Sequence, residues 1–251
     1  MPLRLLEICC GENQSWSKAA RALGFECVTL DWERRCAPDL CMDVRQFRPE
    51  EHGDFQIVCA SPDCRELSQA RRAHGGKKGD EEFADSVGKA CVAIIQQYVA
   101  RGGMRILENP AQALPKRAWM AQFAHLGRTI DYCMYSGERP TDFDGSRPSK
   151  QKVGDWFPYR KPTTIFVFGD PTQWLPARAR CKRLSGNFGF CDERGVHTSW
   201  GRRCQNQQQI EVCRARGCPH VLSLSELHRI PSALCRELLE LGKQGVKSAT
   251  E

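Results

Sequence analysis

The sequence predicts an α/β fold: a doubly wound, mostly parallel sheet with a small irregular insert. Two observations predict it. Short apolar runs typical of strands alternate with segments of helical periodicity, and this order stops near residue 170. Such alternation places helices on both faces of a parallel sheet. The expected strands are 3–9, 26–31, 55–60, 104–108, 128–135 and 163–168.

Three helices are expected between and after these strands. Residues 15–23 contain helix-forming residues, and Gly24 follows as a natural C-terminal stop. In 83–101, apolar residues recur at helical spacing until a pair of glycines. An amphipathic helix with proline in its first turn is expected over 231–241, followed by a frayed tail.

Composition limits the class of protein. The chain has 251 residues, of which 41% are hydrophobic and 27% charged. These values fit one globular domain, or one domain with a small appendage, and they disfavour a disordered chain. There is no run of about eighteen apolar residues and no secretory signal at the N-terminus. We therefore expect an intracellular protein, in the cytoplasm or nucleus, that is monomeric and has no membrane partner.

Fifteen cysteines need an explanation in such a chain. Cys9, Cys59 and Cys133 lie in strand-like apolar runs, so we expect small buried hydrophobic residues in a reducing compartment. Other cysteines crowd the segment after residue 170, where four could bind zinc. Because no CxxC pair is present and the spacing is irregular, scattered free thiols are favoured over a metal site. The zinc candidates are Cys181, Cys191, Cys213 and Cys218.

The positive charge of the chain is concentrated in one segment. The net charge is +7, and residues 171–220 contain nine Arg or Lys against three acids. A localised basic segment favours a polyanionic partner, nucleic acid first, over a merely solvated face. The expected organisation is a core over 1–169, a Cys-rich basic insert over 170–227 and a C-terminal helix over 228–251 that returns to the core.

The ends of the first strands indicate a nucleoside-binding pocket. The first strand runs into a turn containing Gly11 that opens a helix, but there is no GxGxxG, so a dinucleotide is disfavoured. The second strand ends in Asp31 and Trp32, an acid for ribose hydroxyls and a flat ring for adenine. Asp43 follows the next short strand, where it could meet an adenine amino group. The alternatives are an ordinary turn, a surface acid and a core tryptophan.

Two further strand ends carry reactive groups. Cys64 follows a buried strand and a Ser-Pro turn, which places its thiol for attack at the sheet edge; the alternative is a structural thiol. Glu108 ends the strand MRILE, where a partly desolvated carboxyl can act as a general acid; the alternative is a turn acid.

The order of these segments is specific. The strand–turn–helix of residues 5–25, then DW, SPDC, ENP and RKPTTIFVF, resembles the DNA (cytosine-5) methyltransferases, and most closely their short viral and phage members. The resemblance covers residues 3 to about 168 and returns in HRIPSALCRELLE, 228–240. It implies a Rossmann-like S-adenosylmethionine-dependent methyltransferase fold. It also implies methyl transfer to C5 of cytosine in duplex DNA, with the target base flipped out of the stack.

The resemblance also implies roles for individual residues. Cys64 matches the nucleophile that bonds to C6 of cytosine, and Glu108 matches the acid at N3. Arg160 and Lys161 match the basic motif. The positions matching the S-adenosyl-L-methionine pocket are Glu7, Cys10, Gly11, Asn13, Ser15, Trp16, Asp31, Trp32, Asp43, Val44, Ser61, Pro62 and Ser232.

The sequence departs from the family pattern at the nucleophile. Asp63 stands where proline is usual, and its carboxylate opposes thiolate formation; Arg65, in place of glutamine, can offset it. The basic motif is RKPTT rather than Arg-x-Arg, and the last motif lacks the usual Gly-Asn pair. Two alternatives therefore stay open: a cytosine-5 methyltransferase acting on RNA, tRNA in particular, and a catalytically silent homologue that binds nucleic acid.

Two segments are expected to contact DNA. The basic insert would be the target-recognition region, and its small size predicts a short target or weak specificity. The Gly-rich basic loop 71–82 suits a segment that closes over DNA, although a solvated loop is an equal alternative.

Overall fold

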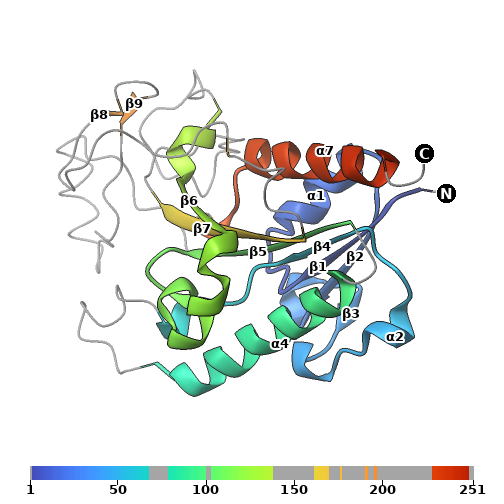
Figure 1. Ribbon diagram of the computed structural model, residues 1–251, viewed down its shortest axis with the longest axis horizontal. Helices are drawn as coiled ribbons and strands as arrows, with labels where there is room; N and C mark the ends of the chain where they lie inside the picture. Colours follow the sequence, from blue (N-terminus) through green and yellow to red (C-terminus); the bar gives the residue numbers. More distant parts are fainter. Residues whose placement is uncertain are drawn as a thin grey trace.

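A seven-stranded, mostly parallel sheet carries helices on both faces (Figure 1). The computed structural model describes residues 2–67, 79–99, 103–137, 161–169 and 228–248, with Pro176 and two short strands, β8 (Phe190–Cys191) and β9 (Gly195–Val196). The strand order of the large sheet is β3-β2-β1-β4-β5-β7-β6, and β7 runs antiparallel to both its neighbours. The predicted doubly wound α/β fold is confirmed.

The central strands are almost wholly apolar because both of their faces are covered. All four residues of β4 are buried, as are four of the five in β1. Strands buried on both sides read as continuous apolar runs rather than as alternating patterns. The bounds are β1 (Arg4–Ile8), β2 (Glu26–Asp31), β3 (Leu40–Cys41), β4 (Ile57–Ala60), β5 (Met104–Pro110), β6 (Gly127–Asp131) and β7 (Pro162–Phe168).

The expected strand 128–135 is wrong in its second half. After β6 the chain forms a 3₁₀ turn, η6 (Tyr132–Tyr135). The backbone N–H of Tyr132 still donates to Lys161, but its buried hydroxyl reaches Glu108 on β5. Residues 132–135 resemble a strand in sequence because they are aromatic or apolar. They are so because most of this turn is buried, not because it is extended.

Helices cover both faces of the sheet. On one face, α1 (Ser15–Ala22) packs against α7 (Ser232–Ser248); on the other lies α4 (Glu81–Val99), with the short α2 (Pro49–His52) beside it (Figure 1). The described residues also form short 3₁₀ turns: η1 (Arg34–Cys36), η2 (Val44–Gln46), η3 (Arg65–Leu67), η4 (Leu114–Lys116) and η5 (Ala118–Leu126). No helix in the described ranges is long and apolar enough to cross a membrane.

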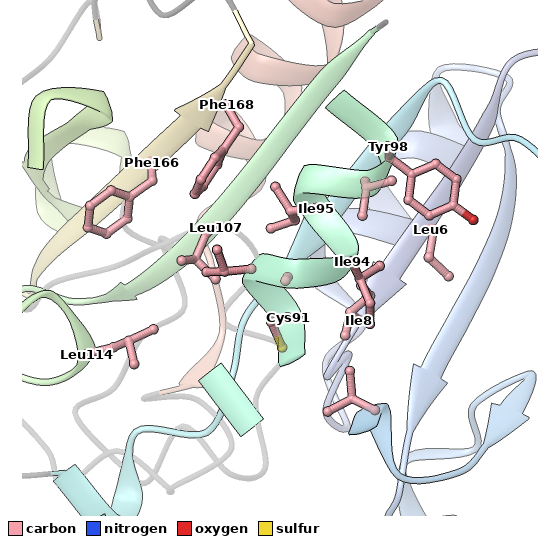
Figure 2. Packing of buried hydrophobic residues seen from close by; sticks show 14 of the residues in the cluster. Leu6, Ile8, Cys91, Ile94, Ile95, Tyr98, Leu107, Leu114, Phe166 and Phe168 are labelled. Atoms are coloured by element: carbon pink, nitrogen blue, oxygen red, sulfur yellow. The ribbon is translucent and has the colours of Figure 1, made fainter. Parts of the chain in front are cut away.

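Among the described residues, the α4 face holds one of two large apolar clusters. Figure 2 shows Ile94, Ile95 and Tyr98 of α4 packed over the sheet, with Leu6 of β1 and Leu107 of β5 beneath them. These side chains recur at the helical spacing that predicted this helix.

The C-terminal helix is longer than predicted. It continues through Gly242, where the sequence suggested a stop, as far as Ser248. A Cβ at this glycine would lie 2.8 Å from Ile57 Cδ1 and 3.2 Å from Met104 Cβ. Gly242 is therefore explained by close approach of the helix to the sheet rather than by helix termination.

Candidate functional site

A cavity of about 340 Å³ opens at the edge of the sheet where β1, β2, β4 and β5 end. This size falls in the range of small-molecule sites. The antiparallel strand β7 begins, rather than ends, at this edge, because Pro110 of β5 pairs with Thr163. The expected site residues that line the cavity are Glu7, Cys10, Gly11, Asn13, Ser15, Asp31, Trp32, Asp43, Val44, Ser61, Pro62, Cys64, Glu108 and Lys161.

At one end of the cavity, the carboxylate of Asp31 accepts hydrogen bonds from two turns, the one after β1 and the one after β2. Gly11 has a φ of 57°, in the left-handed region that glycine tolerates, and its N–H donates to Asp31 Oδ2 at 2.9 Å. Asp31 Oδ1 accepts the N–H of Glu33, also at 2.9 Å. Since a carboxylate offers further lone pairs, this fixed acid at the cavity wall remains able to accept hydrogen bonds from ligand hydroxyls.

An exposed aromatic ring stands beside this acid. Trp32 is 59% exposed, and its ring centre lies 5.9 Å from that of Phe83 on α4. A large aromatic ring left open to solvent at a cavity wall offers a stacking surface for a planar heterocycle. Acid, ring and glycine turn fit an adenosyl group such as that of S-adenosylmethionine.

Glu7 is buried under the first turn of α1. Its carboxylate oxygens accept the backbone N–H groups of Trp16, at 3.2 Å, and Ser17, at 2.9 Å. Burial raises the pKa of Glu7 to about 7, although these hydrogen bonds act in the opposite direction. The carboxyl thereby joins the end of β1 to the start of the helix that borders the cavity.

Glu7 should make the folding stability of the apoprotein decrease with pH. Unfolded, the carboxyl has a pKa near 4.5; folded, near 7, so the folded state binds more protons between these values. Its contribution to the free energy of unfolding should fall by about 3 kcal/mol as pH rises through this window. In urea titrations at pH 4.5 and 7.5, the stability difference between wild type and Glu7→Gln should change by this amount. A constant difference would contradict the shift.

Two of the residues assigned to the pocket lie elsewhere. Trp16 is fully buried in the core between α1 and the sheet, and its indole N–H donates to Ser61 Oγ at 3.3 Å. It supports the wall of the cavity from behind. Ser232 begins α7 and does not line the cavity; His228 and Ile230, from the same motif, do. Arg160 lies outside the described residues.

The segment that carries Cys64 is held by the neighbouring strand. It follows β4 without regular structure, and the amide of Asn109 on β5 donates to the carbonyl oxygen of Pro62 at 2.7 Å. Asn109 Oδ1 in turn accepts the N–H of Leu114 at 3.1 Å. Because Asn109 is buried, its bond to Pro62 fixes the Cys64 segment relative to the adjacent Glu108, and the bond from Leu114 holds the amide in place.

Glu108 has its own support. Glu108 is 5% exposed, and its Oε1 accepts the hydroxyl of Tyr132 at 2.7 Å. The ammonium nitrogen of Lys161 lies 4.8 Å from the centre of the Tyr132 ring, within cation–π range. These groups orient the carboxyl toward the cavity that Cys64 also lines.

The thiol of Cys64 is protonated at neutral pH. Burial raises its pKa to about 11; Lys161 acts to lower it, while Asp63 and Glu108 add to the rise. The opposing effect expected of Asp63 is therefore present but secondary to desolvation. Arg65 forms an ion pair with Asp63, as its sequence position suggested.

Sequence reasoning missed several residues of the cavity wall. Glu12, Glu33 and Arg35 belong to the turns already identified and could have been found by extending those turns. Phe83 and Val87 were read only as the apolar face of a helix. Cys9, expected as a buried hydrophobic residue, is half-buried and faces the cavity, with its sulfur 3.9 Å from that of Cys91. Other lining residues that were missed include Leu30, Cys36, Met42, Glu66, Ala84, Pro110, His228 and Ile230.

Metal binding finds no support in the part of the chain that the structure describes. No group of three or more His, Cys, Asp or Glu side chains there could hold an ion. The zinc candidates Cys181, Cys213 and Cys218 lie outside the described residues, and of Cys191 only the backbone, in β8, is described. The predicted insert 170–227 lies almost entirely outside them as well.

A relative in a virus confirms the resemblance. The chain is 27% identical over 147 residues to a protein of Frog virus 3 (isolate Goorha) named "Probable DNA (cytosine-5)-methyltransferase". The match covers 53% of this chain. It covers 64% of the length of the viral relative, slightly less than two thirds. No family model matches the sequence.

Solved structures show weaker likenesses. A "putative DNA modification methyltransferase" encoded within an E. coli prophage is 10% identical, with a TM-score of 0.40, over 66% of this chain and 46% of its own. The S. pombe Dnmt2 methyltransferase is 13% identical, with a TM-score of 0.36, over 66% and 49%.

Proposed function

We propose that this protein is an S-adenosylmethionine-dependent methyltransferase that acts on C5 of cytosine in DNA. One observation carries the proposal: Cys64 and Glu108, from the ends of adjacent strands, line the same cavity as Asp31 and Trp32. A nucleophile and an acid thus share one enclosed space with a nucleoside-binding wall. The viral relative supports DNA as the substrate.

The chemistry requires both groups because C5 of cytosine is a weak nucleophile. Attack of the Cys64 thiolate on C6 forms a C–S bond and makes C5 electron-rich. The carboxyl of Glu108 hydrogen-bonds to N3 and stabilises the charge that accumulates on the ring. C5 then takes the methyl group, and the donor would be left as a neutral thioether. Transfer of the C5 proton to solvent re-forms the C5–C6 double bond and expels the Cys64 thiolate. The two groups can reach the base only outside the duplex stack, so base flipping is part of the proposal.

The remaining residues of the cavity prepare this reaction. Lys161 provides a positive charge near Cys64 and so favours the thiolate once substrate has entered. Asp31 and Trp32 would hold the ribose and adenine of the cofactor, which supplies an electrophilic methyl group when bound. Asn109 keeps the nucleophile segment beside β5. Action on DNA would support a location inside a cell, in cytoplasm or nucleus.

The decisive experiment is nucleoside mass spectrometry. Unmethylated duplex DNA and unmodified tRNA are incubated separately with purified protein and S-adenosylmethionine. We expect 5-methylcytosine in DNA. Product in tRNA alone would instead indicate a cytosine-5 methyltransferase that acts on RNA. No product in either substrate, with S-adenosylmethionine binding intact, would favour a catalytically silent homologue that binds nucleic acid.

Trp32 offers a separate test of the cofactor site. Replacing it by alanine should raise the dissociation constant for S-adenosylmethionine about tenfold or more, which corresponds to one lost base-stacking contact. Because the ring is exposed, the free energy of unfolding should barely change. Isothermal titration calorimetry and urea unfolding measure the two effects. Unchanged affinity would remove the ring from the site.

A further inference from the structure

Asp63 shapes the backbone around Cys64. Its Oδ1 accepts the N–H of Arg65 at 2.8 Å, two residues on, and so closes a turn with Cys64 at its centre. This is the self-bonded turn that aspartate side chains favour. Proline, usual at this position in the family that the chain resembles, constrains the backbone through its ring. Here a side-chain hydrogen bond constrains the same segment.

Arg65 extends this contact to another turn. Its guanidinium Nε contacts Asp63 Oδ2, and Nη2 lies 3.5 Å from Glu33 Oε1, in the turn after β2. The Asp63 and Arg65 side chains are about half exposed, at 43% and 46%, and that of Glu33 is 24% exposed. Arg65 thus bridges the nucleophile segment and the turn beside Trp32, both of which line the cavity.

Glu33 is itself anchored. Its backbone N–H donates to Asp31, and its carboxylate pairs with Arg35, which also lies 3.5 Å from Glu12. Hydrogen bonds from Arg35 hold the pKa of Glu33 below its usual range, so the residue is ionised at neutral pH. Alternating charges therefore run along the cavity rim from Glu12 to Asp63.

We propose that Glu33, Asp63 and Arg65, here called the rim latch, hold the nucleophile segment against the cofactor-side turn and are positioning residues for Cys64. The positioning of Cys64 for catalysis rests on the proposed function, whereas the contact between the two turns does not. In the latch, Asp63 supplies the turn and Arg65 neutralises the carboxylate that the turn requires. The pair replaces a rigid ring by two contacts that depend on charge and side-chain length.

Two substitutions separate the turn from the charge. Asparagine at position 63 keeps an oxygen that accepts the Arg65 N–H but removes the negative charge, whereas alanine removes both. Hydrogen–deuterium exchange of the 61–67 segment measures the order of the turn without requiring catalysis. In Asp63→Ala, exchange should be about fivefold faster, the factor expected for one lost hydrogen bond, whereas in Asp63→Asn it should stay near wild type. Equal exchange in wild type, Asp63→Asn and Asp63→Ala would overturn the latch.

Alkylation of Cys64 reports the charge. The reagent is iodoacetamide at pH 8, with peptide-level detection. Cys64 should react faster in Asp63→Asn than in wild type, because the negative charge of Asp63, which raises the pKa of the thiol, has been removed. Arg65→Met should react more slowly, because Asp63 loses its partner. The fully buried Cys59 serves as an internal reference, and Glu50→Gln, an exposed change on α2, as the control variant. Alkylation rates that do not respond to either variant would count against the neutralising role of Arg65.

Methylation assays of the same variants distinguish the two proposals. We expect Asp63→Ala to lose several-fold more turnover than Asp63→Asn, with an unchanged dissociation constant for S-adenosylmethionine. If wild type yields no 5-methylcytosine while exchange differs as expected, the proposed function fails and the latch stands. If methylation occurs but Asp63→Ala and Asp63→Asn are equally active and equally ordered, the latch fails and the function stands.

Discussion

Replacing Cys64 by alanine should abolish methyl transfer. Without the thiol no bond forms to C6, C5 is never activated, and turnover should fall by at least about a thousandfold. Asp31 and Trp32, proposed to hold S-adenosylmethionine, lie on another turn of the cavity wall, so its dissociation constant should not change. A duplex containing 5-fluorocytosine tests the bond itself, because fluorine at C5 prevents the final elimination and leaves the protein attached to DNA.

Denaturing electrophoresis should show this adduct for wild type and not for Cys64→Ala. Cys41→Ala is the matched control, because Cys41 is exposed and does not line the cavity. An adduct that persists in Cys64→Ala would assign the nucleophile to another of the fifteen cysteines. Loss of cofactor binding in the same variant would instead indicate a folding defect.

Glu108→Gln should lower turnover by about a hundredfold to ten-thousandfold, the range for loss of a general acid. Glutamine keeps the size of the side chain and an oxygen that can accept the Tyr132 hydroxyl, so the fold should be preserved. Single-turnover kinetics with saturating DNA measures the effect on the chemical step. The rate of adduct formation with 5-fluorocytosine should fall in parallel, because the carboxyl assists the thiol addition.

The exposed Glu240 on α7 provides the control substitution for this variant. If Glu240→Gln and Glu108→Gln retained equal turnover, Glu108 would have no catalytic role. A defect in DNA affinity alone, with normal single-turnover rates, would make Glu108 a binding group.

The strand ends could be located from the sequence because position along a parallel strand fixes which edge of the sheet a residue reaches. Asp31, Cys64 and Glu108 each lie at or just beyond the end of an apolar run, and all three line the cavity. Lys161 reaches the same edge for a different reason: it precedes an antiparallel strand, so the start of β7 meets the end of β5. Only the family resemblance, not the strand pattern, marked it.

Side-chain direction at helix starts and turns could not be obtained in this way. Trp16 follows the glycine turn in sequence, yet the first turn of α1 directs its ring into the core. Tyr132 is a residue type that is common in strands. Its support of Glu108 depends on a hydrogen bond to a residue twenty-four positions earlier, which no local pattern predicts. The bridge from Arg65 to Glu33 likewise joins two turns that no local pattern connects.

The packing of α7 on α1 has a consequence for biosynthesis. Leu234, Leu238 and Leu239 of α7 complete an apolar cluster that includes Leu5 of β1 and Trp16 of α1, from the beginning of the chain. During translation the part of this cluster that α7 covers stays exposed until residues 232–248 have been made. Until then the nascent chain therefore presents this part of its apolar surface to its surroundings.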